Sequence, residues 1–130
     1  MMKNITKTMI SLILACLIIT ACAPAPAYQA ITPADAREVL KNDSGAILLD
    51  VRTQAEYEEL RIPGSILLPV DEIASGAETL LPDKNAAILV YCRSGNRSRT
   101  ASMQLLGMGY TRVFDLGGII NWPYETESGK

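Results

Sequence analysis

The chain has 130 residues and a formal net charge of −2, with three cysteines and no histidine. A length in this range favours one domain, and the acidic balance argues against nucleic-acid binding, which needs a basic surface. The missing histidine excludes a Ser-His-Asp triad, a Cys-His protease pair, histidine acid–base catalysis and any zinc site that contains histidine.

The first 21 residues have the pattern of a secretory signal. Lys3 and Lys7 precede an apolar run over residues 9–19 that is too short to cross a bilayer. The following Ile-Thr-Ala-Cys, which ends at Cys22, resembles a bacterial lipobox. That resemblance implies removal of residues 1–21 and attachment of lipid to Cys22. The alternative is an ordinary signal peptide in which Cys22 has no role.

We therefore expect a lipid-anchored protein of the bacterial cell envelope. It would face the periplasm or the exterior, with the outer membrane favoured in a Gram-negative host. Residues 22–27 combine the lipidated cysteine with alternating Ala and Pro, which is typical of a semi-rigid linker. The folded domain is predicted over residues 28–126. Loss of Cys16 and lipidation of Cys22 leave Cys92 as the free thiol of the mature chain, so no internal disulfide is expected.

The first half of the domain alternates strand and helix signals. Residues 28–31 predict a short edge strand. Thr32 as N-cap and Pro33 at the first helical position predict a helix that ends within residues 42–45. The apolar run 46–51 is typical of a strand buried on both faces. Thr53 can cap a short helix that ends at Glu59. A turn over residues 62–64 and a short strand over residues 65–68 follow.

The second half continues the alternation. Residues 71–81 predict a weak helix and residues 82–85 a loop. Residues 86–91 form the next clear strand, and a helix is expected over residues 98–108. A strand over residues 112–114 then leads through a glycine turn to a short closing helix that contains Trp122. Alternating strands and helices predict an α/β fold, with a parallel sheet covered by helices on both faces.

A polar loop follows the predicted strand 86–91 and contains Cys92, Arg93, Ser94, Gly95, Asn96 and Arg97. The carboxyl ends of strands are where α/β sheets bind ligands. Gly95 gives the loop freedom to curl its N–H groups inward, and the following helix adds the positive end of its dipole. Both effects favour the Cys92 thiolate and lower its pKa below about 8.5. The alternative is a buried core cysteine.

Four motifs, in order over residues 28–124, resemble those of the rhodaneses, the thiosulfate sulfurtransferases. They are the loop 92–98, residues 48–52 with Glu56 and Tyr57, residues 62–65, and residues 116–118 with Trp122. The resemblance implies a three-layer α/β fold with a central parallel sheet of about five strands. In that family a histidine usually precedes the Ile-Pro-Gly turn, and here Arg61 stands in its place. We expect this change to be neutral to catalysis, because the family's reaction needs no histidine base.

The resemblance also implies a chemistry for the loop. The Cys92 thiolate attacks the outer sulfur of thiosulfate or a similar small anionic donor, and the resulting persulfide passes its sulfur to cyanide or a thiol. No second free cysteine exists in the mature chain, so the acceptor must come from outside. We expect a monomer without metal, nucleotide or flavin.

The residues around Cys92 have more than one interpretation. The substrate is expected to be bound by the six residues that follow the cysteine, namely Arg93, Ser94, Gly95, Asn96, Arg97 and Ser98. Arg93 and Arg97 are expected to seat a doubly charged donor, although their side chains could instead point to solvent. Ser98 could bond the loop or the bound sulfur, or simply cap the helix. For Asp50 and Arg52 we favour a structural role, in which the pair fixes loops near the site, over direct tuning of the site.

Two other functions remain open. Phosphatases and arsenate reductases of a related fold separate their cysteine and arginine by five residues. Here four residues separate Cys92 from Arg97 and six separate it from Arg99, so Ser98 stands where that arginine is needed. The other alternative is a rhodanese module that carries persulfide, senses redox state or docks a partner at the membrane without catalysis.

Overall fold

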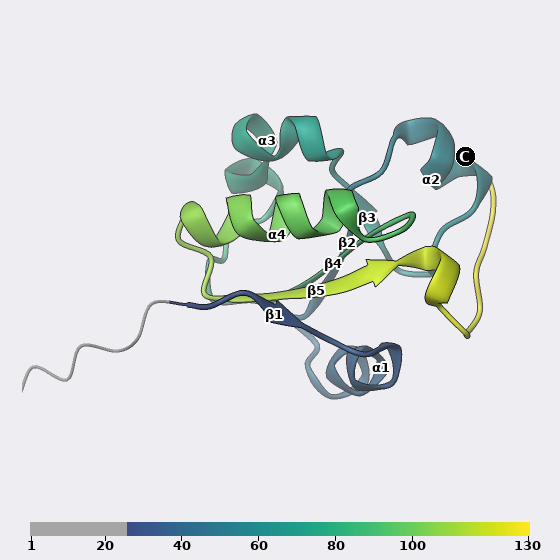
Figure 1. The fold of residues 1–130 in the computed structure, drawn as a ribbon, viewed down its shortest axis with the longest axis horizontal. Coiled ribbons are helices and arrows are strands. Elements are labelled where there is room, and N and C mark those ends of the chain that lie inside the picture. The colour runs from purple at the N-terminus through teal and green to yellow at the C-terminus, as the bar shows by residue number, and fades with distance from the viewer. Residues whose placement is uncertain (1–25) are drawn as a thin grey trace, which may run out of the picture.

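The computed structural model describes residues 26–130. The predicted signal peptide and the lipidation site at Cys22 lie outside these residues. Within them, five parallel strands form one sheet in the order β1-β5-β4-β2-β3 (Figure 1). The elements, in chain order, are β1 (Gln29–Ala30), α1 (Pro33–Asn42), β2 (Ile47–Asp50), α2 (Gln54–Glu59), β3 (Ile66–Leu67), the 3-10 turn η1 (Val70–Glu72), α3 (Ile73–Leu80), β4 (Ala87–Cys92), α4 (Asn96–Gly107), β5 (Arg112–Gly118) and the 3-10 turn η2 (Ile119–Asn121).

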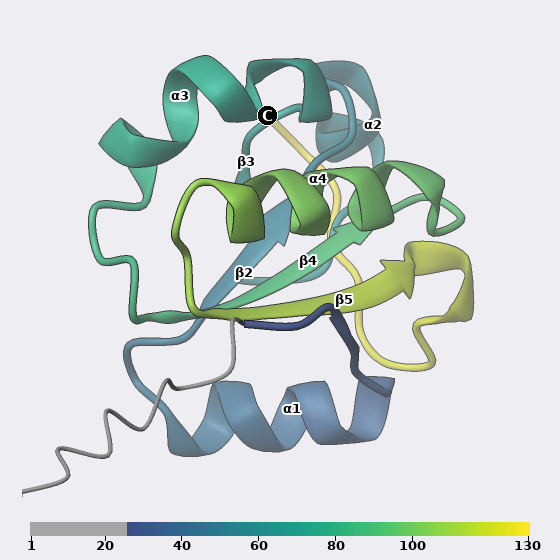
Figure 2. The same cartoon turned by 60° about the vertical axis from the view of Figure 1, so that its left-hand side comes forward.

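Helices cover both faces of the sheet. Figure 2 shows α3 and α4 on one face and α1 on the other. Alternate residues of β4 supply both cores, because successive side chains of a strand point to opposite faces. Ile88 and Val90 pack with Leu105 on the α4 side, and Leu89 packs with Ala36 on the α1 side. The predicted α/β fold with a parallel sheet of five strands is confirmed.

The first two helices begin where their capping residues predict. The Thr32 side chain accepts the N–H of Asp35 at the start of α1. Thr53 and Glu56 form a complete capping box at the start of α2, in which each side chain accepts a backbone N–H of the other residue. A capping box ties a helix start to the chain before it, so α2 is held close to the end of β2.

Several boundaries differ from the sequence-based expectation. The predicted closing helix with Trp122 is the 3-10 turn η2, which ends at Asn121, and two further differences lie beside the cysteine. Helix α4 begins at Asn96 instead of Ser98, because Gly95 occupies the N-cap position with a φ of +111°. Strand β5 continues to Gly118, although the glycines predicted a turn after residue 114. A register shift opposite Val90 and Tyr91 absorbs the extra residue, so Gly118 still pairs with Cys92. The loop that bears the cysteine is therefore shorter than predicted.

Among residues 26–130, no helix combines the length and the apolar character that crossing a membrane would require.

Candidate active site

Cys92 is the last residue of the central strand, and the chain turns over its side chain immediately afterwards. Only Arg93, Ser94 and Gly95 separate β4 from α4. The N–H of Gly95 donates to the Cys92 Sγ over 3.0 Å. The left-handed backbone of Gly95 is what turns this N–H back toward the strand. The cysteine residue is 1 % exposed and its sulfur lies beneath the loop.

Opposing effects act on the ionisation of this thiol. Burial raises its pKa, because a buried thiolate loses solvation. Hydrogen bonds from the Ser98 hydroxyl and from the N–H groups of Ser98, Gly95 and Ser94 act in the other direction. The net effect lowers the pKa of the Cys92 thiol below its ordinary value. The thiol is thus both buried and surrounded by donors, in an arrangement suited to an anionic sulfur.

Ser98 lies in the first turn of α4 and is fully buried. Its hydroxyl donates to the carbonyl of Gly95 over 3.0 Å, and the same hydroxyl can donate to the Cys92 sulfur. A hydroxyl has a single proton to donate, so these two bonds are alternatives. Ionisation of the sulfur, or addition of a second sulfur, favours the bond to sulfur.

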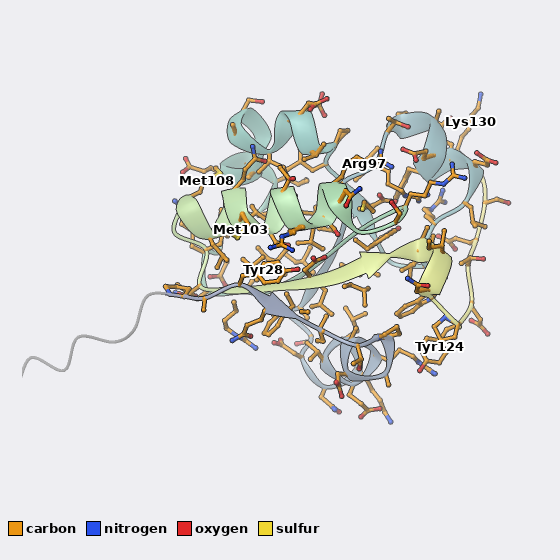
Figure 3. The ribbon with its side chains drawn as sticks, in the orientation of Figure 1. Tyr28, Arg97, Met103, Met108, Tyr124 and Lys130 are labelled. Carbon is orange, nitrogen blue, oxygen red and sulfur yellow. The ribbon has the colours of Figure 1, made fainter. Side chains whose placement is uncertain are left out.

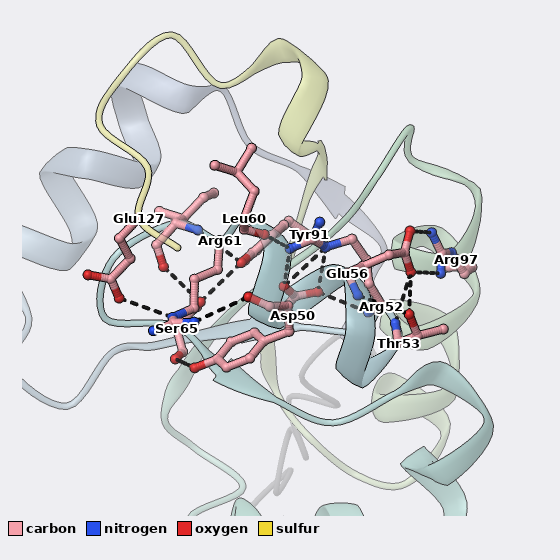
Figure 4. A network of polar contacts seen from close by, with 12 residues as sticks. Asp50, Arg52, Thr53, Glu56, Leu60, Arg61, Ser65, Tyr91, Arg97 and Glu127 are labelled. Carbon is pink, nitrogen blue, oxygen red and sulfur yellow. Dashed lines mark hydrogen bonds and ion pairs between the residues drawn. The ribbon is translucent and has the colours of Figure 1, made fainter. Parts of the chain in front are cut away.

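Arg97 reaches from α4 to α2, and its guanidinium also lies near enough to Cys92 for the thiolate to contribute to its raised pKa. Its Nη1 and Nη2 atoms donate to the two carboxylate oxygens of Glu56 over 2.8 and 2.9 Å, and Figure 4 shows this two-point contact. Figure 3 places Arg97 at the opposite end of α4 from Met108. The Arg97 guanidinium is the main cause that lowers the pKa of Glu56 to about 2. Arg97 therefore ties α4 to α2, although the sequence led us to expect it on the donor.

Glu56 is a residue of the site that the sequence analysis did not assign a role. Its carboxylate accepts from the backbone N–H of Thr53 as well as from Arg97. The capping pattern from Thr53 to Glu56 was visible in the sequence. The contact to Arg97, which is 41 positions away, was not.

The remaining loop residues face outward. Arg93, Ser94 and Asn96 are exposed. Arg93 makes no side-chain hydrogen bond or ion pair to any residue from 26 to 130, and its carbonyl accepts the N–H of Ile120 over 3.3 Å. Arg93 is thus the cation of the loop that is available to a ligand.

Glycines at the end of β5 form a close backing for the loop. A Cβ on Gly118 would lie 2.4 Å from the carbonyl oxygen of Arg93 and 2.7 Å from the Cα of Ser94. The N–H of Gly117 donates to Asp115 over 2.9 Å, which holds this stretch in place. The pair of glycines predicted a turn; their contact with the cysteine loop comes from the pairing of β5 with β4.

Asp50 and Arg52 form a buried ion pair at the end of β2. The Nη2 of Arg52 lies 2.7 Å from the Oδ2 of Asp50, and the same nitrogen donates to the carbonyl of Leu60 over 2.6 Å. Both side chains are almost fully buried. The pair therefore connects the end of β2 to the end of α2, and its purely structural role stays a prediction.

Arg61 holds the carboxyl-terminal segment against α2. Its backbone N–H and carbonyl form two hydrogen bonds with Glu127, and its Nε pairs with the Glu127 carboxylate over 3.1 Å. Its Nη1 donates to the carbonyl of Gly129 over 2.6 Å. Its guanidinium is thus held by the carboxyl-terminal segment and by the Tyr57 carbonyl, which gives the side chain a packing role.

Comparisons with known proteins agree with this geometry. The rhodanese-like domain family matches residues 32–124. The thiosulfate sulfurtransferase PspE of Escherichia coli is 38 % identical over 71 residues, which make up 55 % of this chain and 68 % of that protein. A sulfurtransferase of Allochromatium vinosum is 38 % identical over 84 residues, or 64 % of this chain and 77 % of the relative.

A longer relative is the adenylyltransferase and sulfurtransferase UBA4 of Candida albicans. It is 35 % identical over 105 residues, and the match covers 75 % of this chain but only 24 % of the relative. The chain thus spans about a quarter of that protein's length.

Solved structures give the same family. A rhodanese with anions from E. coli has a TM-score of 0.61 at 33 % identity, over 65 % of this chain and 99 % of that one. A thiosulfate sulfurtransferase from Pseudomonas aeruginosa has a TM-score of 0.72 at 28 % identity, over 79 % of this chain and 21 % of that one. The sheet, the cysteine loop and these matches together show that this chain belongs to the rhodanese-like domain family, a family of sulfurtransferases.

Proposed function

We propose that this chain transfers sulfane sulfur from thiosulfate or a similar donor to a thiophilic acceptor through a persulfide on Cys92. The observation that carries the proposal is the Gly95 N–H directed at the Cys92 sulfur over 3.0 Å. That contact, with the other donors around the thiol, favours the thiolate, which is the nucleophilic form.

The proposed reaction has two steps. The Cys92 thiolate attacks the outer sulfur of thiosulfate, a new S–S bond forms, and the S–S bond of thiosulfate breaks with its electron pair leaving on sulfite. In the second step, cyanide or a thiolate attacks the outer sulfur of the persulfide, and the electron pair returns to Cys92. Such double displacement gives ping-pong kinetics.

The site residues divide this work between them. The N–H groups of the loop stabilise the negative sulfur in both states. Arg93 attracts the anionic donor, because it is the exposed cation of the loop without a partner among residues 26–130. Arg97 is held by Glu56 and supports the loop from outside.

A mass measurement tests the first step. The purified full chain, mixed with thiosulfate, is expected to gain the mass of one sulfur atom, and Cys92→Ser is expected to gain none. Turnover with cyanide then shows catalytic release. The proposal fails if wild-type protein gains no mass, or if Cys92→Ser gains as much. Faster turnover of an aryl phosphate than of thiosulfate would instead support the phosphatase alternative.

A second candidate function is that of a persulfide carrier without turnover. YrkF of Bacillus subtilis, described as a putative sulfur carrier protein, is 32 % identical over 92 residues, or 70 % of this chain and 49 % of that protein. The burial of Cys92 supports this candidate, because a covered persulfide is protected from small nucleophiles. Loading followed by a single delivery, with no turnover on cyanide or thiols, would identify a carrier.

We also propose that Cys22 carries lipid and anchors a monomeric domain in the cell envelope. The support is the basic segment, the short apolar run and the Ile-Thr-Ala-Cys sequence before the Pro/Ala linker. Radiolabelled palmitate is expected to label the wild-type chain in a bacterial host and to leave Cys22→Ser unlabelled. Equal labelling of both proteins would contradict the proposal.

A further inference from the structure

A small hollow lies beside the cysteine loop. Its volume is about 210 Å³, and its walls are formed by three apolar residues, Leu60, Ile119 and Ile120, and four charged residues, Arg52, Glu56, Glu59 and Arg93. Arg93 directly follows the nucleophile in the chain, and its carbonyl accepts the N–H of Ile120. The hollow therefore adjoins the loop that would carry the persulfide.

Two charges in this hollow are not neutralised by the protein. The carboxylate of Glu56 is paired with Arg97, and the Arg52 guanidinium is paired with Asp50. Glu59 and Arg93 are exposed, and neither forms an ion pair or a side-chain hydrogen bond with another residue between positions 26 and 130. The walls thus offer one free negative and one free positive group.

The apolar walls are also exposed. Leu60 is 41 % exposed and Ile120 is 66 % exposed, and both belong to the few large apolar side chains that residues 26–130 leave open to solvent. A ligand that covers them gains free energy from the apolar surface that it removes from water. Opposite charges on apolar walls fit a small molecule that carries both an ammonium and a carboxylate on a short carbon chain.

We propose that this hollow binds the sulfur acceptor, and that the acceptor is a small amphoteric thiol of the amino-acid class, such as cysteine. Its carboxylate would meet Arg93 and its ammonium would meet Glu59. An acceptor without a positive group would leave Glu59 unmatched. This inference rests on the proposed sulfurtransferase function and specifies the second step of that reaction.

The transfer is balanced without any further reactant. The acceptor thiolate attacks the outer sulfur of the Cys92 persulfide, and a new S–S bond forms on the acceptor. The S–S bond to Cys92 breaks, and its electron pair returns to the Cys92 sulfur as the thiolate. The products are a persulfide of the amino acid and the free enzyme.

The test measures the second step alone. Full-length protein is loaded with excess thiosulfate, freed of donor, and checked by mass for one added sulfur. Three thiols are then compared as acceptors in single-turnover reactions, namely cysteine, N-acetylcysteine and cysteine methyl ester. Each rate constant is divided by that of the wild type with the same thiol, which removes differences in the thiols' own reactivity.

Charge removal is expected to follow the acceptor's groups. Glu59→Gln should slow transfer to cysteine and to the methyl ester about threefold, the size of one partly exposed ion pair, and leave N-acetylcysteine unchanged. Arg93→Gln should slow transfer to cysteine and to N-acetylcysteine by a similar factor, and leave the methyl ester unchanged. Glu58→Gln and Arg99→Gln are the matched controls, since neither residue lines the hollow.

Two results would overturn the inference. The first is an equal effect of each variant on all three thiols, and the second is no effect on any of them. In both cases loading and delivery to cyanide would still support the proposed function. Failure of the wild-type protein to load sulfur would instead remove the proposed function, and this inference with it.

Discussion

The Ser98 hydroxyl is the donor near Cys92 that a substitution removes without altering the backbone. Ser98→Ala is expected to raise the pKa of the thiol, because it deletes a hydrogen bond to the thiolate. Alkylation of Cys92 at neutral pH should slow by about three- to tenfold, the typical net worth of one hydrogen bond of about 1 kcal/mol. The rate of reaction with iodoacetamide as a function of pH measures this, and its midpoint should move to higher pH.

Ser102 provides the control for this substitution. It is buried in the same helix, and its hydroxyl has no hydrogen-bond partner in the described part of the chain. Ser102→Ala should leave the alkylation profile in place. If both alanine variants shift the profile equally, the effect comes from packing in α4 and not from the donor.

Single residues were predictable from sequence to the extent that their contacts are local. The order of Cys92, Gly95 and a following helix was enough to predict N–H donors around the sulfur, because Cys92 lies only four positions before the start of α4. The partner of Arg97 was not predictable, since Glu56 approaches it only after α2 and α4 are placed. The depth at which Cys92 lies likewise depends on β5, which joins the sheet from later in the sequence.

The ion pair between Glu56 and Arg97 makes the packing of α2 on α4 dependent on pH. Folding lowers the pKa of Glu56 from its ordinary 4.5 to about 2. The unfolded state therefore binds more protons in this range, so the carboxylate stabilises the fold above pH 4.5 and its contribution is lost as the pH falls toward 2. Urea unfolding at about pH 6 and about pH 3 should show a smaller loss of stability for Glu56→Gln than for wild type.

Glutamine keeps the shape of the side chain and one acceptor oxygen, which can still receive the Thr53 N–H of the capping box, whereas its NH2 group cannot accept from Arg97. Glu56→Gln therefore removes the charge and one bond to Arg97 without removing the capping box. Glu78→Gln is a matched control, since the ion pair of Glu78 with Lys84 is largely exposed. An identical pH response of wild type and Glu56→Gln would show that the Arg97 contact does not stabilise the fold.

Strand β5 supports the loop through a glycine that leaves no room for a side chain. Gly118→Ala would bring a Cβ to 2.4 Å from the Arg93 carbonyl oxygen. It is expected to lower the free energy of unfolding by about 1–3 kcal/mol and to slow persulfide loading. Gly107→Ala, at the end of α4 where nothing lies within 4 Å, should be neutral or stabilising by up to about 1 kcal/mol. Equal stability of the two variants, measured by thermal unfolding, would contradict this account.

Elements were easier to predict at their starts than at their ends. The N-cap residues Thr32 and Thr53 predicted the starts of α1 and α2, because a capping hydrogen bond joins residues that are close in the chain. The end of β5 was missed because Gly117 and Gly118 are turn residues on their own. Pairing with β4 and a register shift keep them in the strand.

At the scale of the whole molecule, Arg61 binds the carboxyl-terminal segment to the end of α2. Arg61→Ala removes the ion pair to Glu127 and the bond to the Gly129 carbonyl. The variant is expected to lose about 1 kcal/mol of stability and to release peptides from beyond Tyr124 faster during limited proteolysis. Persulfide loading should be unchanged, because the contacts of Arg61 are with Tyr57, Glu127 and Gly129 and none is with residues 92–98. A loss of loading with an intact tail would assign Arg61 to the reaction instead.

Arg112→Ala is the comparison for this experiment, since Arg112 forms an exposed ion pair with Asp43 away from the tail.

At the scale of the whole molecule, the alternation of elements predicted the parallel sheet and its two helical layers, because parallel strands require crossovers. The strand order and the antiparallel bridge from Arg61 to Glu127 were beyond the sequence, since both join segments distant along the chain.

The parallel sheet also determines how the domain would sit if it is tethered. The chain enters β1 from the edge where the strands begin, while Cys92 lies at the edge where they end (Figure 1). A lipid attached upstream of Tyr28 would hold the domain by the edge where the strands begin. The edge that bears Cys92 would then face away from the membrane, toward solutes. An anchor moved to the carboxyl terminus would reverse this orientation, because the N–H of Gly129 donates to the carbonyl of Glu58 in α2, which Arg97 joins to the start of α4. Moving the anchor is thus expected to bring the edge that bears Cys92 close to the bilayer and to slow its reaction with anions.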